Sequence, residues 1–224
     1  MKNNTKIITA IIAGTVLLAG LMIMLSAQSF SNQGKYVEVK GLSERIVKSD
    51  RAMWPINFEV KSNSSSDLFS QIEQNISNVK EFLVNAGFEE SEIAVAPVDT
   101  YQDTYQGSQY RYNARISMSV YTDKVDLVRS TSQQTLELVQ KGIVMNGSYI
   151  SFEFSDINSV KPEMLAEAIK NARESAQQFA DDSGVKVGDI ARANQGVFSI
   201  TEKDPGSPEY KNIRVVSTLR YLLN

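Results

Sequence analysis

Alternating polar and apolar residues mark several stretches of this chain as β-strands, because successive side chains of a strand point to opposite faces. The clearest alternation runs from Tyr110 to Val120, where every second residue is apolar. Another stretch carries four large apolar side chains on one face, those of Trp54, Ile56, Phe58 and Val60. We therefore expect Trp54 to pack in a core rather than to bind a ligand. Pro55 cannot donate a ladder hydrogen bond, which predicts a sheet edge or a bulge at that point.

Shorter patterns of the same kind predict further strands, over residues 35–40, 43–48, 92–101, 148–154, 185–201 and 212–223. We expect Gly41 to end the first of these strands and Ser49-Asp50 to form a turn. The polar stretch 102–109, which contains Gly107, predicts a hairpin loop.

Apolar residues recur at helical spacing in three places. The first helix is predicted between a cap at Ser64 and a stop at Gly87. The second covers residues 123–142 and carries the apolar side chains of Val125, Val128, Leu136 and Val139. The third begins near Pro162, which suits a first helical turn, and ends at Gly184. Its inward stripe is rich in alanine and consists of Leu165, Ala168, Ile169, Ala172, Ala176, Phe179 and Ala180. Such small side chains predict that this helix lies close to its neighbour.

The order of these elements predicts an α+β fold. From residue 52 onward the order is β-α-β-β-α-β, which is that of the split ferredoxin-like unit. We expect a largely antiparallel sheet with helices packed on one face, built on this ferredoxin-like core and extended by a helix and two strands.

An uncharged apolar run covers Ile7 to Ala27, which is about the length needed to cross a bilayer as a helix. Lys2 and Lys6 precede it, so residues 1–6 are predicted to stay in the cytoplasm. Residues 28–34 then form a linker, and residues 35–224 form one domain outside the cytoplasm. The alternative is a cleavable signal segment with its site at Leu25-Ser26-Ala27, which would release a secreted domain.

Composition restricts the chemistry of the exported domain. Lys2 and Lys6 are two of the 23 basic residues, and the remaining 21 face 26 acidic ones, so the formal charge beyond the apolar run is −5. This argues against a nucleic-acid partner, which requires a basic surface. The chain has no histidine and no cysteine. Disulfides, thiol nucleophiles and triads with a histidine base are therefore excluded. We expect no enzyme activity and no cofactor.

Acidic residues cluster in two places, at Glu89-Glu90 with Glu92 and at Asp181-Asp182 with Asp189. Carboxylates alone can carry glycosidase-like hydrolysis or bind Ca²⁺. Both clusters lie at predicted helix ends in polar sequence, and neither has the D-x-D-x-D-G spacing of a calcium loop. We expect solvated helix ends.

Aromatic and basic residues surround the predicted hairpin loop, and both types are enriched at the centres of protein interfaces. The candidate interface consists of Tyr101, Tyr105, Tyr110, Arg111 and Tyr112, with Arg115 nearby. The alternative for Tyr110 and Tyr112 is that they are ordinary core-face residues of the long strand.

Short segments in a fixed order resemble the SIMPL-domain family of bacterial envelope proteins, from about Tyr36 to Leu223. The shared segments are Val39-Lys40-Gly41, Ser49-Asp50-Arg51-Ala52, Ala86-Gly87-Phe88, Tyr112-Asn113-Ala114, Ile150-Ser151-Phe152, residues 165–176 and residues 183–188. The chain departs from the family in having Ser49-Asp50 where Pro-Asp is frequent, and in Trp54-Pro55, which indicates a distinct branch.

The resemblance implies an exported or envelope-associated protein without catalytic residues. It also implies links to stress tolerance, to kinase-associated signalling in animals, and to self-assembly into ring- or channel-like oligomers. We therefore expect a membrane-anchored, non-enzymatic domain that forms a large homo-oligomer, with itself and the membrane as partners. The alternative is a monomeric binding or signalling module that recognises a protein or a small ligand through residues 101–112.

Overall fold

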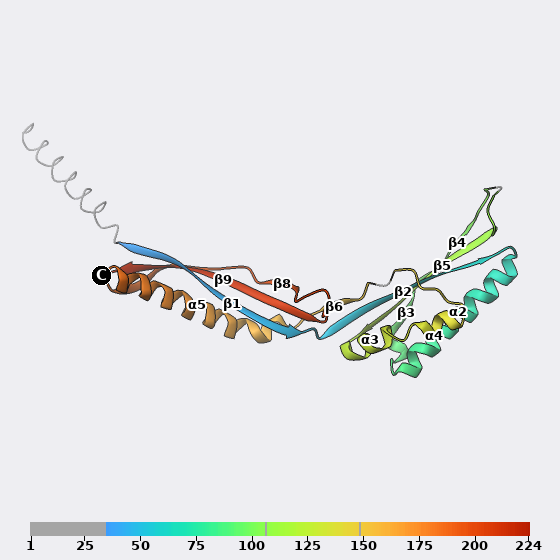
Figure 1. Ribbon diagram of the computed structural model, residues 1–224, viewed down its shortest axis with the longest axis horizontal. Coiled ribbons are helices and arrows are strands. Elements are labelled where there is room, and N and C mark those ends of the chain that lie inside the picture. The colour runs from blue at the N-terminus through green and yellow to red at the C-terminus, as the bar shows by residue number, and fades with distance from the viewer. Residues whose placement is uncertain (1–34, 106, 148) are drawn as a thin grey trace, which may run out of the picture. The chain divides into compact units, whose positions relative to one another are not determined.

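The computed structural model describes residues 35–105, 107–147 and 149–224 (Figure 1). The predicted cytoplasmic segment, membrane helix and linker, residues 1–34, lie outside these residues. Within the described part, no helix is long and apolar enough to cross a membrane. The fold is α+β, with two antiparallel sheets and four α-helices in the part of the chain described. The expectation of one extended sheet was therefore wrong.

The chain divides into two compact units. We call residues 44–164 and 198–214 the central unit, and residues 35–43, 165–197 and 215–224 the terminal unit. In the central unit the strand order is β3-β5-β2-β6, and β4 also pairs with β5. The strands are β2 (Arg51–Ser62), β3 (Ile93–Val95), β4 (Asp99–Gln102), β5 (Tyr112–Thr122) and β6 (Ser151–Glu153). The expected β-α-β-β-α-β order is present, although the strand predicted over 92–101 is split into β3 and β4.

The core of the central unit lies between its sheet and its helices. Antiparallel pairing sets Trp54 opposite Val120, and the alternation then buries every second residue of both strands. Trp54 is only 1% exposed, which confirms the prediction that it packs in the core. Pro55 pairs with Ser119 in unbroken register, and β6 reaches only as far as Met53 on the other side. The prediction of an edge strand or a bulge was therefore wrong, because β2 lies between β5 and β6 and has no bulge at Pro55. The missing N–H is tolerated because β6 ends before Pro55.

Helix α2 (Ser65–Ala86) covers the buried face of this sheet and matches its prediction. The Ser64 hydroxyl accepts the Asp67 N–H at 3.3 Å, and Gly87 ends the helix with a φ of 113°. Only a residue without a side chain adopts that backbone angle freely, so the stop is encoded locally. In Figure 1, α2 lies on the same side of the sheet as the two short helices that follow β5.

The helix predicted over residues 123–142 is instead two helices, α3 (Val125–Ser132) and α4 (Leu136–Gln140). The hydroxyls of Ser130 and Ser132 donate to backbone carbonyls three residues earlier, and this competition with the helical ladder favours a break. The break changes the buried face. Leu136, predicted to point inward, is 71% exposed, and Leu138 is buried in its place.

The second sheet has the order β1-β9-β7, and β8 also pairs with β9. Its strands are β1 (Tyr36–Lys48), β7 (Val187–Gln195), β8 (Ser199–Glu202) and β9 (Tyr210–Leu223), and the fourth α-helix is α5 (Ile157–Asp182). The larger parts of β1, β9 and α5 and all of β7 belong to the terminal unit, whereas β8 falls within the central unit. The single strand predicted over 185–201 is two strands, with Gly196 between them. A Cβ on Gly196 would lie 1.9 Å from the Val216 carbonyl oxygen, so this glycine marks a close backbone approach.

Gly41 does not end β1, which was the prediction. It lies inside a continuous strand at the place where α5 packs on β1, and a Cβ there would lie 1.8 Å from the carbonyl oxygen of Ala168. The facing residues of α5 are fully buried alanines: Ala168, Ala172, Ala176 and Ala180. The expectation that these alanines permit close packing is confirmed. Ile169 and Phe179, predicted to share that stripe, are exposed.

Helix α5 begins at Ile157, one turn before the start predicted at Pro162. The backbone just before this start is bonded by a carboxylate that is distant in sequence. The Asp50 carboxylate, in the turn after β1, accepts the backbone N–H groups of Ser155 at 2.9 Å and Asp156 at 3.1 Å. Burial alone raises the pKa of Asp50, but these bonds and one from the Ser155 hydroxyl outweigh it, so the pKa lies below the ordinary value.

Replacing Asp50 with asparagine is therefore expected to destabilise the central unit by about 1–2 kcal/mol at pH 7, because the charged acceptor is lost. A carboxyl group whose pKa is lowered by folding contributes its full stabilisation of the folded state at pH values above the pKa that it has in the unfolded chain. The difference between Asp50→Asn and the parent should shrink as the pH falls below 3.8, the ordinary value. Urea unfolding followed by Trp54 fluorescence at pH 7 and pH 3 measures this difference in unfolding free energy. Asp182→Asn, at an exposed position on α5, is the control. An equal difference at both pH values would contradict this account.

Candidate functional site

The predicted hairpin is present and is held to the end of β2. Asp99 of β4 pairs with Arg115 of β5, and Gln102 pairs with Tyr112. Asn63, just after β2, makes two hydrogen bonds to the segment that precedes β5. Its side-chain amide donates to the Gln109 carbonyl at 3.1 Å, and its amide oxygen accepts the Arg111 N–H at 3.0 Å. Within the loop, the bond from the Tyr105 N–H lowers the pKa of Asp103. The described residues of the hairpin are thus held to the sheet by hydrogen bonds.

The candidate interface residues do not form one cluster. Tyr101 pairs with Asn113, the residue after Tyr112, so the side chains of Tyr101 and Tyr112 leave the strands in opposite directions, although both residues border one groove between α2 and β4. The Arg115 guanidinium lies 5.3 Å from the centre of the Tyr101 ring, and that of Arg111 lies 5.5 Å from the Tyr112 ring. Tyr105 is 78% exposed in the loop. The candidates are therefore distributed between two cation–aromatic pairs and a solvated tip.

Tyr110 and Tyr112, for which a core position was the alternative, differ from each other. Tyr112 is half-buried and packs against the central core, whereas Tyr110 is exposed and precedes the first residue of β5. Core packing thus describes Tyr112 alone.

An apolar groove lies between the N-terminal half of α2 and β4. It has a volume of about 410 Å³ and is lined by Ser65, Leu68, Phe69, Ile72, Thr100, Tyr101, Gln102 and Tyr112. We call it the α2–β4 groove. Phe69 is 61% exposed, although most of its neighbours on the groove face of α2 are buried. The sequence analysis did not single out Phe69. The available signal was an aromatic residue directly after Leu68, which is one of the apolar residues at helical spacing in this helix.

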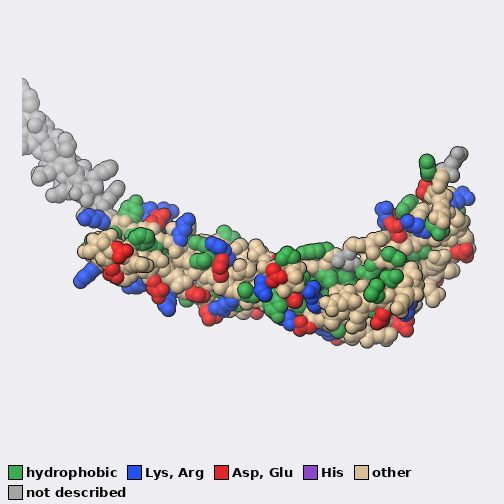
Figure 2. Space-filling model, in the orientation of Figure 1, with side chains coloured by type: hydrophobic (Ala, Val, Ile, Leu, Met, Phe, Trp, Pro, Cys, Tyr) green, Lys and Arg blue, Asp and Glu red, His purple; other side chains and the backbone are tan. Residues whose placement is uncertain are grey.

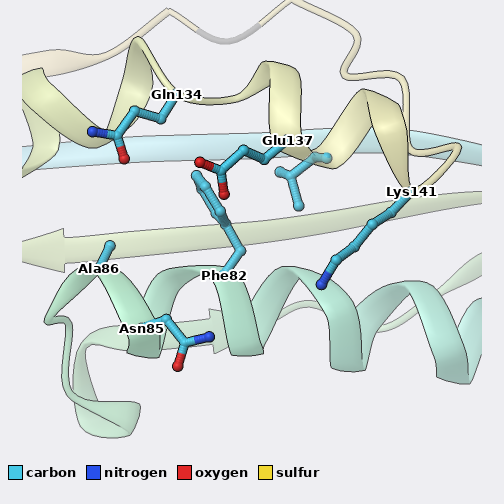
Figure 3. Close-up of a pocket in the computed structure, with 7 residues that line it drawn as sticks. Phe82, Asn85, Ala86, Gln134, Glu137 and Lys141 are labelled. Atoms are coloured by element: carbon cyan, nitrogen blue, oxygen red, sulfur yellow. The ribbon is translucent and has the colours of Figure 1, made fainter.

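A second cavity, of about 270 Å³, lies between the C-terminal half of α2 and α4 (Figure 3). Its lining is mainly polar and includes Asn85, Gln134, Glu137 and Lys141. In Figure 3 the side chains of Phe82 and Glu137 point toward each other, and that of Lys141 points toward α2. The Lys141 ammonium lies 3.5 Å from the Glu81 carboxylate. These groups can form polar contacts to a small molecule, but their charges are exposed and already partly paired.

The acidic clusters match the expected solvated helix ends only in part. Asp181 and Asp182 are exposed at the end of α5, whereas Asp189 lies in β7 and Glu92 is half-buried. The Glu92 carboxylate accepts the Thr122 hydroxyl at 2.5 Å and the Lys124 ammonium at 2.9 Å, and it caps the short helical turn of Glu90–Glu92. Burial raises the pKa of Glu92, but these bonds outweigh it and the pKa is lowered. Asp181 accepts the Gln177 amide at 2.8 Å. Among residues 35–105, 107–147 and 149–224, no three acidic side chains are grouped so as to hold a metal ion.

Strand β7 of the terminal unit presents an open edge. Within the described chain it pairs with β9 alone, in regular register from Arg192 to Gln195. Apart from its first two residues, its side chains are exposed on both faces of the sheet. These include Ile190, and Val197 just beyond the strand is 90% exposed. We call residues 187–197 the β7 edge.

Comparisons with known proteins bear on this geometry. The family model SIMPL, described as a protein of unknown function (DUF541), matches residues 37–216. No curated protein matches the chain. Among solved structures, the ligand-free regulatory subunit of aspartate kinase from Thermus thermophilus is similar over 82% of this chain and 88% of that chain, with 13% sequence identity and a TM-score of 0.21. A likeness of that size supports no inference about function.

Proposed function

Because the chain belongs to the SIMPL (DUF541) family of proteins of unknown function, we propose that it is a non-enzymatic envelope domain that self-associates. In this proposal residues 7–27 anchor it in the bacterial membrane, and residues 35–224 lie outside the cytoplasm. The partners are further copies of the chain. Any role in stress tolerance is carried by the family resemblance alone.

The observation that supports self-association is the β7 edge. An exposed strand edge offers unpaired N–H and C=O groups to another strand, and proteins usually cover or interrupt it. Here the edge has a regular segment at Arg192–Gln195 and apolar side chains at Ile190 and Val197. A second chain that covers it would satisfy the backbone groups and bury those side chains.

The terminal unit has a second open edge, which determines how copies could be joined. The sheet order β1-β9-β7 places β1 and β7 on opposite sides of β9. Pairing β7 of one copy with β1 of the next would use two different surfaces, so each copy would keep one free edge for a further copy. Such heterologous contacts close into rings when the rotation between copies permits and otherwise form filaments. This agrees with the large assembly expected from the family.

The charges on the surface support a protein partner rather than a nucleic acid. Figure 2 shows Lys and Arg side chains interspersed with Asp and Glu side chains over the visible face. A nucleic-acid surface would instead concentrate positive charge.

The proposal predicts an oligomer that a charge on the β7 edge disrupts. Full-length protein in a mild detergent should give a mass of several protomers by light scattering, corrected for bound detergent. Ile190→Lys combined with Val197→Lys should shift the mass to a monomer, because burying two ammonium groups is costly. Leu136→Lys on α4, which also replaces an exposed apolar side chain, is the control and should leave the mass unchanged.

Two results would count against this proposal. A parent protein that stays monomeric at high concentration would refute self-association. An oligomer whose mass is unaffected by the double substitution would show that another surface joins the copies.

A further inference from the structure

We propose that the α2–β4 groove binds an extended peptide, which adds to β4 as a further strand and places apolar side chains in the groove. This binding function is separate from self-association, since the groove belongs to the central unit and the β7 edge to the terminal unit.

The backbone of β4 is open on one side. In the described chain β4 pairs only with β5. The Ala96 N–H donates to the Ser117 carbonyl and the Asp103 N–H to the Arg111 carbonyl. The backbone groups of odd-numbered residues of β5 therefore point toward β4. In an antiparallel pair, bonded and non-bonded positions alternate. The backbone groups of Thr100 and Gln102, which face even-numbered residues of β5, therefore point to the open edge.

The same two residues line the groove. Thr100 pairs with Ala114, which is fully buried on the α2 side of the sheet, and Gln102 pairs with Tyr112. Their side chains accordingly lie on the face that α2 covers. A strand added beside β4 would thus find backbone partners at Thr100 and Gln102, and its alternate side chains would face the groove.

The groove selects for apolar or aromatic side chains. Leu68 and Ile72 form its floor and are buried, while Phe69 stands exposed beside them. Tyr112 contributes a half-buried ring that carries the Arg111 guanidinium at 5.5 Å. A single branched or aromatic side chain fits a volume of about 410 Å³ with room for a second.

Two arginines pack on lining residues of the groove. The Arg111 guanidinium lies 5.5 Å from the centre of the Tyr112 ring, and that of Arg115 lies 5.3 Å from the centre of the Tyr101 ring. The open backbone of β4 and the apolar lining therefore indicate an extended peptide with apolar residues at alternate positions.

The experiment uses a fluorescein-labelled synthetic peptide of sequence Lys-Thr-Val-Thr-Phe-Thr-Val-Lys and full-length protein in detergent, with anisotropy as the readout. Two N-methylated isomers, each modified at one alternate set of residues, test strand addition. Only one set of N–H groups can face β4, so one isomer should bind at least about tenfold more weakly than the other. Equal binding of both isomers, or no saturable binding at about 1 mM peptide, would overturn the proposal.

Variants locate the site. Phe69→Ala should weaken binding about fivefold or more, and Phe179→Ala, which removes a similarly exposed ring from α5, should have no effect. Gln102→Pro removes an N–H that faces the open edge, not one that bonds β5, and should abolish binding while the Trp54 fluorescence stays that of the parent. Parent-like affinity in both Phe69→Ala and Gln102→Pro would refute the site. The β7 edge variant should bind the peptide normally, so failure of self-association and failure of peptide binding are distinguishable.

Discussion

Replacing Gly41 with alanine is expected to destabilise the terminal unit by about 3 kcal/mol or more, since the added methyl group has no space. The Cβ would lie 1.8 Å from the Ala168 carbonyl oxygen, 2.6 Å from the Ala172 nitrogen and 2.8 Å from the Ala172 Cβ. Two of these atoms belong to the backbone of α5, so no change of side-chain rotamer relieves the contact. The helix must move away from β1, and the buried alanine stripe then loses its packing.

Urea unfolding followed by far-ultraviolet circular dichroism measures this loss. Lys40→Ala is the matched control, because Lys40 is the exposed neighbour of Gly41 in the same strand and should change the free energy of unfolding by about 0.5 kcal/mol at most. Trp54 lies in the other unit, so its fluorescence reports separately on the central unit. A Gly41→Ala protein as stable as the parent would show that α5 does not lie directly on β1.

Replacing Trp54 with alanine is expected to cost about 3–5 kcal/mol, the range for removing a large buried aromatic side chain. Trp54 is among the largest fully buried side chains and lies opposite Val120 in the β2–β5 pair. The cavity would be bordered by strands on a fixed register, which limits how far the surroundings can collapse.

Met53, the adjacent residue on the exposed face of β2, provides the control for that substitution. Met53→Ala should change the unfolding free energy by about 0.5 kcal/mol, whereas Trp54→Phe should fall between control and alanine variant. Circular dichroism in urea is again the measurement. If the two alanine variants were equally stable, Trp54 would not be a core residue, and ligand binding would become the better interpretation of this side chain.

Elements encoded by neighbouring residues were predictable from the sequence. Residues close by in sequence determine the alternation in β2 and β5, the cap at Ser64 and the stop at Gly87. The hairpin between β4 and β5 is of the same kind, and its loop follows from the polar run and Gly107.

Features set by distant residues were not predictable in this way. Gly41 resembles a strand breaker until the backbone of Ala168 is placed against it. The Asp50 carboxylate, which bonds the backbone just before α5, is 105 positions before Ser155. Likewise, nothing near Gly196 in sequence reveals how closely the Val216 carbonyl approaches it.

The candidate site shows the same limit. Tyrosines close together in sequence suggested one cluster, but the strand alternation that predicted β5 also sends Tyr101 and Tyr112 to opposite faces. The groove combines residues of α2 with residues of β4 that lie about 30 positions later. Periodicity identifies buried faces well, but it does not show where two elements leave a space between them.

The pairing of β1 with β9 affects how the protein is made. The bond from the Leu223 N–H to the Lys35 carbonyl, at 2.8 Å, joins residues nearly the whole length of the described chain apart. The strands of the central sheet lie between Arg51 and Glu153, so that sheet can form while β9 is still being synthesised. At typical rates of elongation, β1 waits on the order of 10 s for its partner strand. Closure of the terminal sheet is therefore a late, long-range step of folding, and until then β1 lacks the strand that satisfies its backbone groups.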